Sequence, residues 1–64
     1  MIALTKLDNQ TVLINLETVK YIEQVPDTIV FFTNGDSLMV KESLEDISEK
    51  FQHMQAEILK SSKS

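Results

Sequence analysis

The chain has 64 residues, enough for one domain, and a chain of this size buries only roughly 60% of the surface that it exposes when unfolded. It contains no cysteine and one histidine, which excludes disulfides, thiolate metal sites and a multi-histidine site within one chain. Ten acidic residues stand against six lysines and no arginine, a net charge of −4, which disfavours nucleic acid and anionic membranes as partners.

The first two apolar segments predict a hairpin. Ile2–Leu7 (IALTKL) and Thr11–Asn15 (TVLIN) are strand candidates. Asp8-Asn9-Gln10 between them is a cluster of turn residues. A loop of about three residues joins such strands with the least chain.

The next segment, 16–25 (LETVKYIEQV), has two periodicities. Its first apolar residues are three apart, which suits a helix, whereas the alternation from Val19 to Val25 suits a strand. Val, Tyr and Ile favour strands, and Pro26 disfavours helical geometry at the residue before it. We therefore predict a strand at Val19–Val25, preceded by a short turn.

Two further strands are predicted after the turn at residues 26–28. Ile29–Thr33 and Asp36–Lys41 flank Asn34-Gly35, the strongest turn signal in the chain. Both turn residues tolerate positive φ, so the pair predicts a two-residue type I′ turn.

The hydrophobic period then changes to that of a helix. Ser43 and Asp46 form a variant of the capping box. The apolar positions that follow are spaced three and four apart: Leu44, Ile47, Phe51, Met54 and Ile58. This stripe is expected to cover one face of the sheet and to supply the intramolecular core. The alternative use is pairing with a copy of itself, although two heptads are too few for an isolated coiled coil.

The predicted fold class is therefore α+β, a small antiparallel β-meander of about five strands followed by one C-terminal amphipathic helix. Residues 1–60 are expected to form a single domain and residues 61–64 a polar tail. No apolar run is longer than four residues, so no membrane insertion is expected. The start of the chain does not read as a signal peptide, and a cytoplasmic location is expected.

The strands at residues 29–33 and 36–41 carry apolar residues at successive positions and hence on both faces. One helix covers only one face, and an exposed apolar face usually marks an interface. Self-association into a dimer or a higher homo-oligomer is expected to cover the second apolar face. The alternative is that the twisted sheet closes into a barrel and covers itself. The candidate oligomer interface comprises Ile29, Val30, Phe31, Phe32, Leu38, Met39 and Val40.

No constellation of catalytic residues stands out. Gly35 is the only glycine, which excludes a glycine-rich phosphate loop, and His53 reads as a solvated helix residue. An enzyme is not expected, and neither is a cofactor or a metal. A polar corner that the core does not need is a candidate partner contact, formed by Glu23, Asp27, Lys41 and Glu42.

Several short segments together resemble the FlbD family, whose members in swarming bacteria are called swarming motility protein D. The segments are Met1–Leu7 (MIALTKL), Asn15, Val19–Glu23 (VKYIE), Pro26–Thr28 (PDT), Asn34-Gly35 and Val40–Ser43 (VKES). One departure is the first hairpin turn, where the family usually has Asn-Gly and this chain has Asp8-Asn9-Gln10.

The resemblance implies a small cytoplasmic protein encoded among flagellar genes. Such proteins look like accessory factors that raise the power of the flagellar motor, acting near the stators at the flagellar base, without a catalytic activity or cofactor. The alternative is an RNA-binding post-transcriptional regulator, because carbon-storage regulators are small dimers of five-stranded chains with a C-terminal helix. Those regulators need a basic strand edge, and this chain has no arginine.

Overall fold

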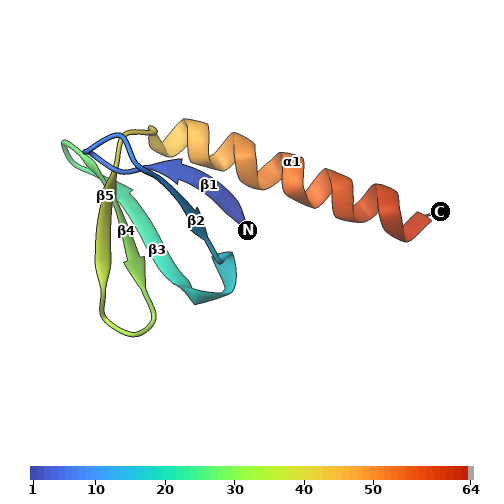
Figure 1. Ribbon diagram of the computed structural model, residues 1–64. Coiled ribbons are helices and arrows are strands. Elements are labelled where there is room, and N and C mark those ends of the chain that lie inside the picture. Colours follow the sequence, from blue (N-terminus) through green and yellow to red (C-terminus); the bar gives the residue numbers. More distant parts are fainter. Residues whose placement is uncertain (64) are drawn as a thin grey trace.

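The computed structural model describes the backbone of residues 1–63 and the side chains of residues 1–54. Five strands and a short 3₁₀ turn precede one long helix, as predicted (Figure 1). The elements are β1 (Ile2–Thr5), β2 (Thr11–Ile14), η1 (Leu16–Thr18), β3 (Val19–Gln24), β4 (Thr28–Phe32), β5 (Ser37–Val40) and α1 (Leu44–Lys63). The α+β class is therefore confirmed. The backbone of α1 includes three residues of the predicted polar tail, and Ser64 lies outside the described residues.

The strands form two antiparallel sheets. β1 pairs with β2, and β4 pairs with β3 on one side and β5 on the other. The sheets meet where Lys6 forms an isolated bridge with Val40 and the Lys41 N–H donates to the Thr5 carbonyl at 2.8 Å. A single continuous meander is not confirmed, because the first hairpin pairs within itself and is joined to the second sheet by backbone pairing only at this point.

The β4–β5 hairpin closes through a three-residue loop, so the predicted type I′ turn is wrong. The Phe32 N–H donates to the Asp36 carbonyl at 2.9 Å, and the Gly35 N–H donates to the Phe32 carbonyl at 3.0 Å. A type I′ turn needs positive φ at both central residues, whereas only Gly35, at +95°, has it. The pattern is that of a type I turn followed by one left-handed residue.

The β1–β2 hairpin repeats this loop with a different residue. The Asn9 N–H donates to the Lys6 carbonyl at 2.9 Å, and the Lys6 N–H donates to the Gln10 carbonyl at 2.8 Å. Asn9 has φ +72° and takes the position that Gly35 holds in the other loop. Asparagine is among the few residues that adopt this conformation at low cost, so the loop forms without a glycine.

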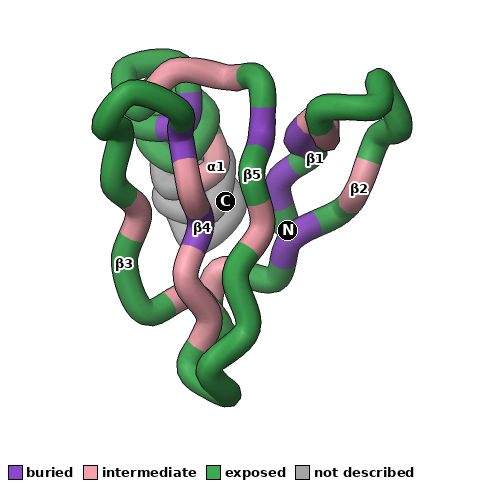
Figure 2. The backbone as a smooth tube through the Cα atoms, turned by 90° about the vertical axis from the view of Figure 1, so that its left-hand side faces the viewer, coloured by how far each residue is buried: buried purple, intermediate pink, exposed green. Residues whose placement is uncertain are grey.

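The core lies between the two sheets. Figure 2 shows buried positions on strands of both sheets. Of the described α1 side chains, Ile47 is buried with them and Met54 packs against the cluster. The buried apolar set is Ile2, Leu4, Ile14, Val30, Val40 and Ile47. The expectation that the helix supplies the core is thus wrong, because the β1–β2 hairpin contributes Ile2, Leu4 and Ile14 to it. Leu44 and Phe51 of the helix stripe remain 43% and 38% exposed, and the side chain of Ile58 lies outside the described residues.

Candidate interaction surfaces

The start of α1 is fixed against the end of β3. The Gln24 side-chain carbonyl accepts the Leu44 N–H at 2.8 Å. The predicted capping box is confirmed, since the Asp46 N–H donates to Ser43 Oγ at 3.0 Å and the Ser43 N–H donates to Asp46 Oδ2 at 3.4 Å. These bonds satisfy amides that a helix N-terminus otherwise leaves unpaired, and they set the direction in which α1 leaves the sheets.

Glu42 holds the strand–helix junction to β1. One carboxylate oxygen accepts the Thr5 N–H and the other accepts the Thr5 hydroxyl, each at 2.9 Å. Burial alone raises the pKa of Glu42, but bonds from the Thr5 and Glu42 N–H groups, the Thr5 hydroxyl and the charge of Lys50 hold the pKa below its ordinary value of 4.5. The carboxylate therefore contributes to the fold in its ionised form.

The residues of the predicted polar corner lie next to positions that meet at one end of the three-stranded sheet. Thr28 pairs with both Gln24 and Val40, so the β3–β4 loop and the end of β5 lie together. The corner residues Glu23, Asp27, Lys41 and Glu42 flank these positions in the sequence. Two of them serve contacts within the chain: Glu42 binds Thr5, and Lys41 donates to the Asn9 side chain. A contact of this corner with another protein stays a prediction.

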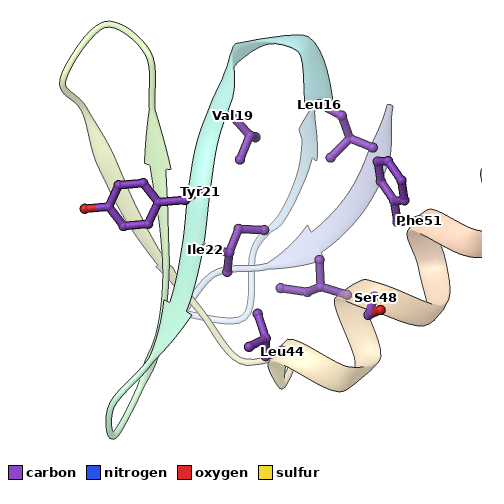
Figure 3. Close-up of a pocket in the computed structure, with 8 residues that line it drawn as sticks. Leu16, Val19, Tyr21, Ile22, Leu44, Ser48 and Phe51 are labelled. Atoms are coloured by element: carbon purple, nitrogen blue, oxygen red, sulfur yellow. The ribbon is translucent and has the colours of Figure 1, made fainter.

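An open apolar groove runs between α1 and the edge formed by η1 and β3. Its volume is about 430 Å³. Leu16, Val19 and Ile22 point into it from the sheet side, and Leu44 and Phe51 come from the helix side (Figure 3). We call this the β3–α1 groove, and its lining is Leu16, Val19, Tyr21, Ile22, Leu44, Ile47, Ser48 and Phe51. Tyr21 only borders the groove, because its ring points away from the helix (Figure 3).

The opposite face of the three-stranded sheet also carries large apolar side chains, beside Glu23, which pairs with Ile29. Tyr21 and Phe31 stack there with ring centroids 4.6 Å apart and planes at 24°. Ile29 pairs with Met39 across β4 and β5, and Met39 is 43% exposed. We call Tyr21, Ile29, Phe31 and Met39 the outer sheet face.

The predicted oligomer interface divides between the inside and the outside of the chain. Val30 and Val40 are buried, and Phe32 and Leu38 pack against the core. Ile29, Phe31 and Met39 belong to the outer sheet face, because successive side chains of a strand point to opposite sides. Those three residues are the outward-facing part of the predicted set, Phe32 and Leu38 are half-buried, and the role of the set as an interface stays a prediction.

The β3–α1 groove was not predicted as a surface. Its sequence signal was the three-residue spacing of Leu16, Val19 and Ile22, the pattern that competed with the strand assignment. η1 and a register shift between Val19 and Tyr21 bring these three side chains to one side even though β3 is a strand. Two strand positions separated by this shift then face the same way.

Two other kinds of site are absent from the described residues. Among the described residues, no group of three or more His, Cys, Asp or Glu side chains is placed to hold a metal ion. The described part of the chain also has no helix that is long and apolar enough to cross a membrane.

Comparison with known protein families shows to which family the chain belongs. The FlbD profile, described as flagellar and swarming motility proteins, matches residues 1–59. The chain belongs to the FlbD family. No curated protein and no solved structure gives a significant match. FlbD is a family of flagellar accessory proteins and not a known enzyme family, so this FlbD chain has a role associated with flagella or swarming.

Proposed function

We propose that this FlbD protein supports the power of the flagellar motor and swarming motility through self-association and contacts with other proteins near the flagellar base. Membership of the family over residues 1–59 is the observation on which the motility role rests. The exposed apolar surfaces support the mode of action, because exposed apolar patches of this kind mark interaction sites.

The two apolar surfaces lie on opposite sides of β3. The β3–α1 groove is concave and faces the helix, whereas the outer sheet face is a strand surface with its largest rings stacked on each other. Two separate surfaces allow a chain of this size to contact a copy of itself and another protein at the same time. The partner belongs to the class of motor or stator proteins.

Deletion of the gene and torque measurement on tethered cells under load test the motor role. The expected result is slower rotation under load with an unchanged number of flagella, and recovery when the wild-type gene is restored. Counting flagella separates weak motors from missing ones. Unchanged torque in the deletion strain would exclude the motor role.

The polar corner gives a second test, directed at the partner contact. Asp27 is exposed in the β3–β4 loop, so Asp27→Ala is expected to leave the fold intact and to reduce swarming. Glu49→Gln is a suitable control, because it removes a carboxylate from an exposed position on α1, away from the corner. Normal swarming by the Asp27→Ala strain would remove the corner from the proposal.

A further inference from the structure

We infer that the β3–α1 groove binds a second copy of this chain, whose helix α1 lies antiparallel to the first across a two-fold axis. This inference rests on the self-association in the proposed function and assigns it to particular residues. It places the subunit contact in the groove rather than on the outer sheet face.

The shape and lining of the groove fit a helix. Seven of its eight lining residues are apolar or aromatic, and the eighth is Ser48. Amphipathic helices bind grooves of this kind through apolar residues spaced three and four apart. The chain itself has a helix with that spacing, and its Leu44 and Phe51 are 43% and 38% exposed.

Helix α1 is long enough to occupy the groove of a second chain. The helix has 20 residues, about 30 Å at the standard rise of 1.5 Å per residue. Figure 1 shows it running away from both sheets, so its second half extends beyond the strands. A helix that projects from its own chain beside an open groove has the geometry needed to reach the same groove on a copy.

The charges along α1 favour the antiparallel direction. The first half, residues 44–53, has three acidic residues and one lysine, and the second half, residues 54–63, has one acidic residue and two lysines. A parallel pair places the acidic halves together, whereas an antiparallel pair places each acidic half beside the more basic half of its partner. The two helix dipoles are also opposed in the antiparallel pair.

The groove wall explains why so short a seam suffices. Two heptads do not hold an isolated coiled coil together, but here Leu16, Val19 and Ile22 add a second apolar wall from η1 and β3. Each chain has both a groove and a helix. In a two-fold dimer each helix occupies the groove of the partner, so no groove is left for a third subunit.

Two matched variants test the location of the contact. Phe51→Glu puts a charge in the groove, and Met39→Glu puts one on the outer sheet face at a residue of similar exposure, 38% against 43%. Light scattering after gel filtration is expected to give twice the 7.3 kDa chain mass for the wild type and for Met39→Glu. Phe51→Glu is expected to raise the dissociation constant at least about 30-fold, as loss of a central apolar anchor does.

The opposite pattern would overturn the inference. A wild type that stays a monomer at every concentration, or a Met39→Glu chain that dissociates while Phe51→Glu stays dimeric, would place the contact elsewhere. Circular dichroism shows whether Phe51→Glu still folds. If it does not, Leu44→Glu takes its place, since Leu44 lines the same groove and is 43% exposed.

Cross-linking tests the direction of the helices. The chain has no cysteine, so single cysteines introduced by Ser48→Cys and Gln55→Cys are the only thiols in each variant. Ser48 lines the groove, and position 55 follows it by about two helical turns on the same side of α1. When the two variants are mixed and mildly oxidised, an antiparallel pair is expected to give mainly the mixed disulfide between positions 48 and 55. Predominant 48–48 and 55–55 products would show a parallel pair and would contradict the inference.

The same variants separate this inference from the proposed function. A strain with Phe51→Glu that is monomeric in vitro and has normal torque would leave the groove contact standing and remove self-association from the motor role. A dimer that survives Phe51→Glu, together with lost torque in the deletion strain, would keep the motor role and reject the groove.

Discussion

At the scale of single residues, two loop positions have backbones in the left-handed region. Gly35 has φ +95°, and a Cβ built there would meet nothing within 4 Å. Any cost of a side chain at this position therefore comes from the backbone conformation and not from a clash. Gly35→Ala is expected to lower the free energy of unfolding by about 1 kcal/mol, measured by urea denaturation.

Asparagine provides the control for this backbone effect. Gly35→Asn is expected to cost less than Gly35→Ala, because asparagine adopts the left-handed conformation readily, as Asn9 does in the first hairpin. Equal losses for the two variants would show that the cost at position 35 has another origin.

Glu42 gives a prediction about pH. Its pKa is lower in the folded chain than its ordinary value of 4.5, so its contribution is complete above that pH and is lost as the pH falls through the folded value. Glu42→Gln is expected to reduce the free energy of unfolding near neutral pH by about 1 kcal/mol, less than for a buried charged hydrogen bond because solvent screens this partly exposed carboxylate. The difference between wild type and variant should shrink as the pH falls below 4.5.

Glu49→Gln serves as the reference for this titration, since it removes the same charge from an exposed helix position. Urea denaturation of the three proteins at several pH values from neutral to acidic provides the comparison. A wild-type to Glu42→Gln difference that stays constant over that range would contradict the role given to the ionised carboxylate.

At the scale of elements, the capping box at the start of α1 is both predicted and observed. Ser43 Oγ accepts the Asp46 N–H at 3.0 Å. Ser43→Ala leaves that amide without its side-chain partner and is expected to cost about 1 kcal/mol. Ser43→Asp keeps an acceptor at the same place and is expected to cost less. Denaturation followed by circular dichroism measures both, and equal stability of Ser43→Ala and wild type would show that the cap does not matter.

The elements themselves could be predicted because their signals are local. The segment that forms β3 fits both a helical and a strand period. Its β-branched and aromatic residues, together with Pro26, favour the strand. The geometry of the loops is harder to predict from the sequence. Asn34-Gly35 marks a turn, but a two-residue and a three-residue loop differ by the register of the strands, which side chains far from the turn determine.

The arrangement of the elements depends on contacts that the sequence pattern does not specify. Alternation along β4 and β5 predicts two apolar faces but not what covers each. A hairpin from the start of the chain covers the inner face, so Val30 is buried against strands and not against the helix. Among the described residues of α1, Ile47 is buried in the core and Met54 packs against it, whereas Leu44 and Phe51 line the groove and stay partly exposed.

At the scale of the whole molecule, dimerisation makes the thermal stability of the chain depend on protein concentration. If the folded chain dimerises through the β3–α1 groove and the unfolded chain does not, the midpoint of thermal unfolding rises with protein concentration. For a domain of this size the rise is roughly 3 to 6 °C per tenfold increase in concentration. Phe51→Glu is expected to unfold at one midpoint over the whole dilution series, whereas Met39→Glu is expected to keep the slope of the wild type. A wild-type midpoint that does not move with concentration would mean that the chain folds without a subunit contact, with the groove open for a different protein.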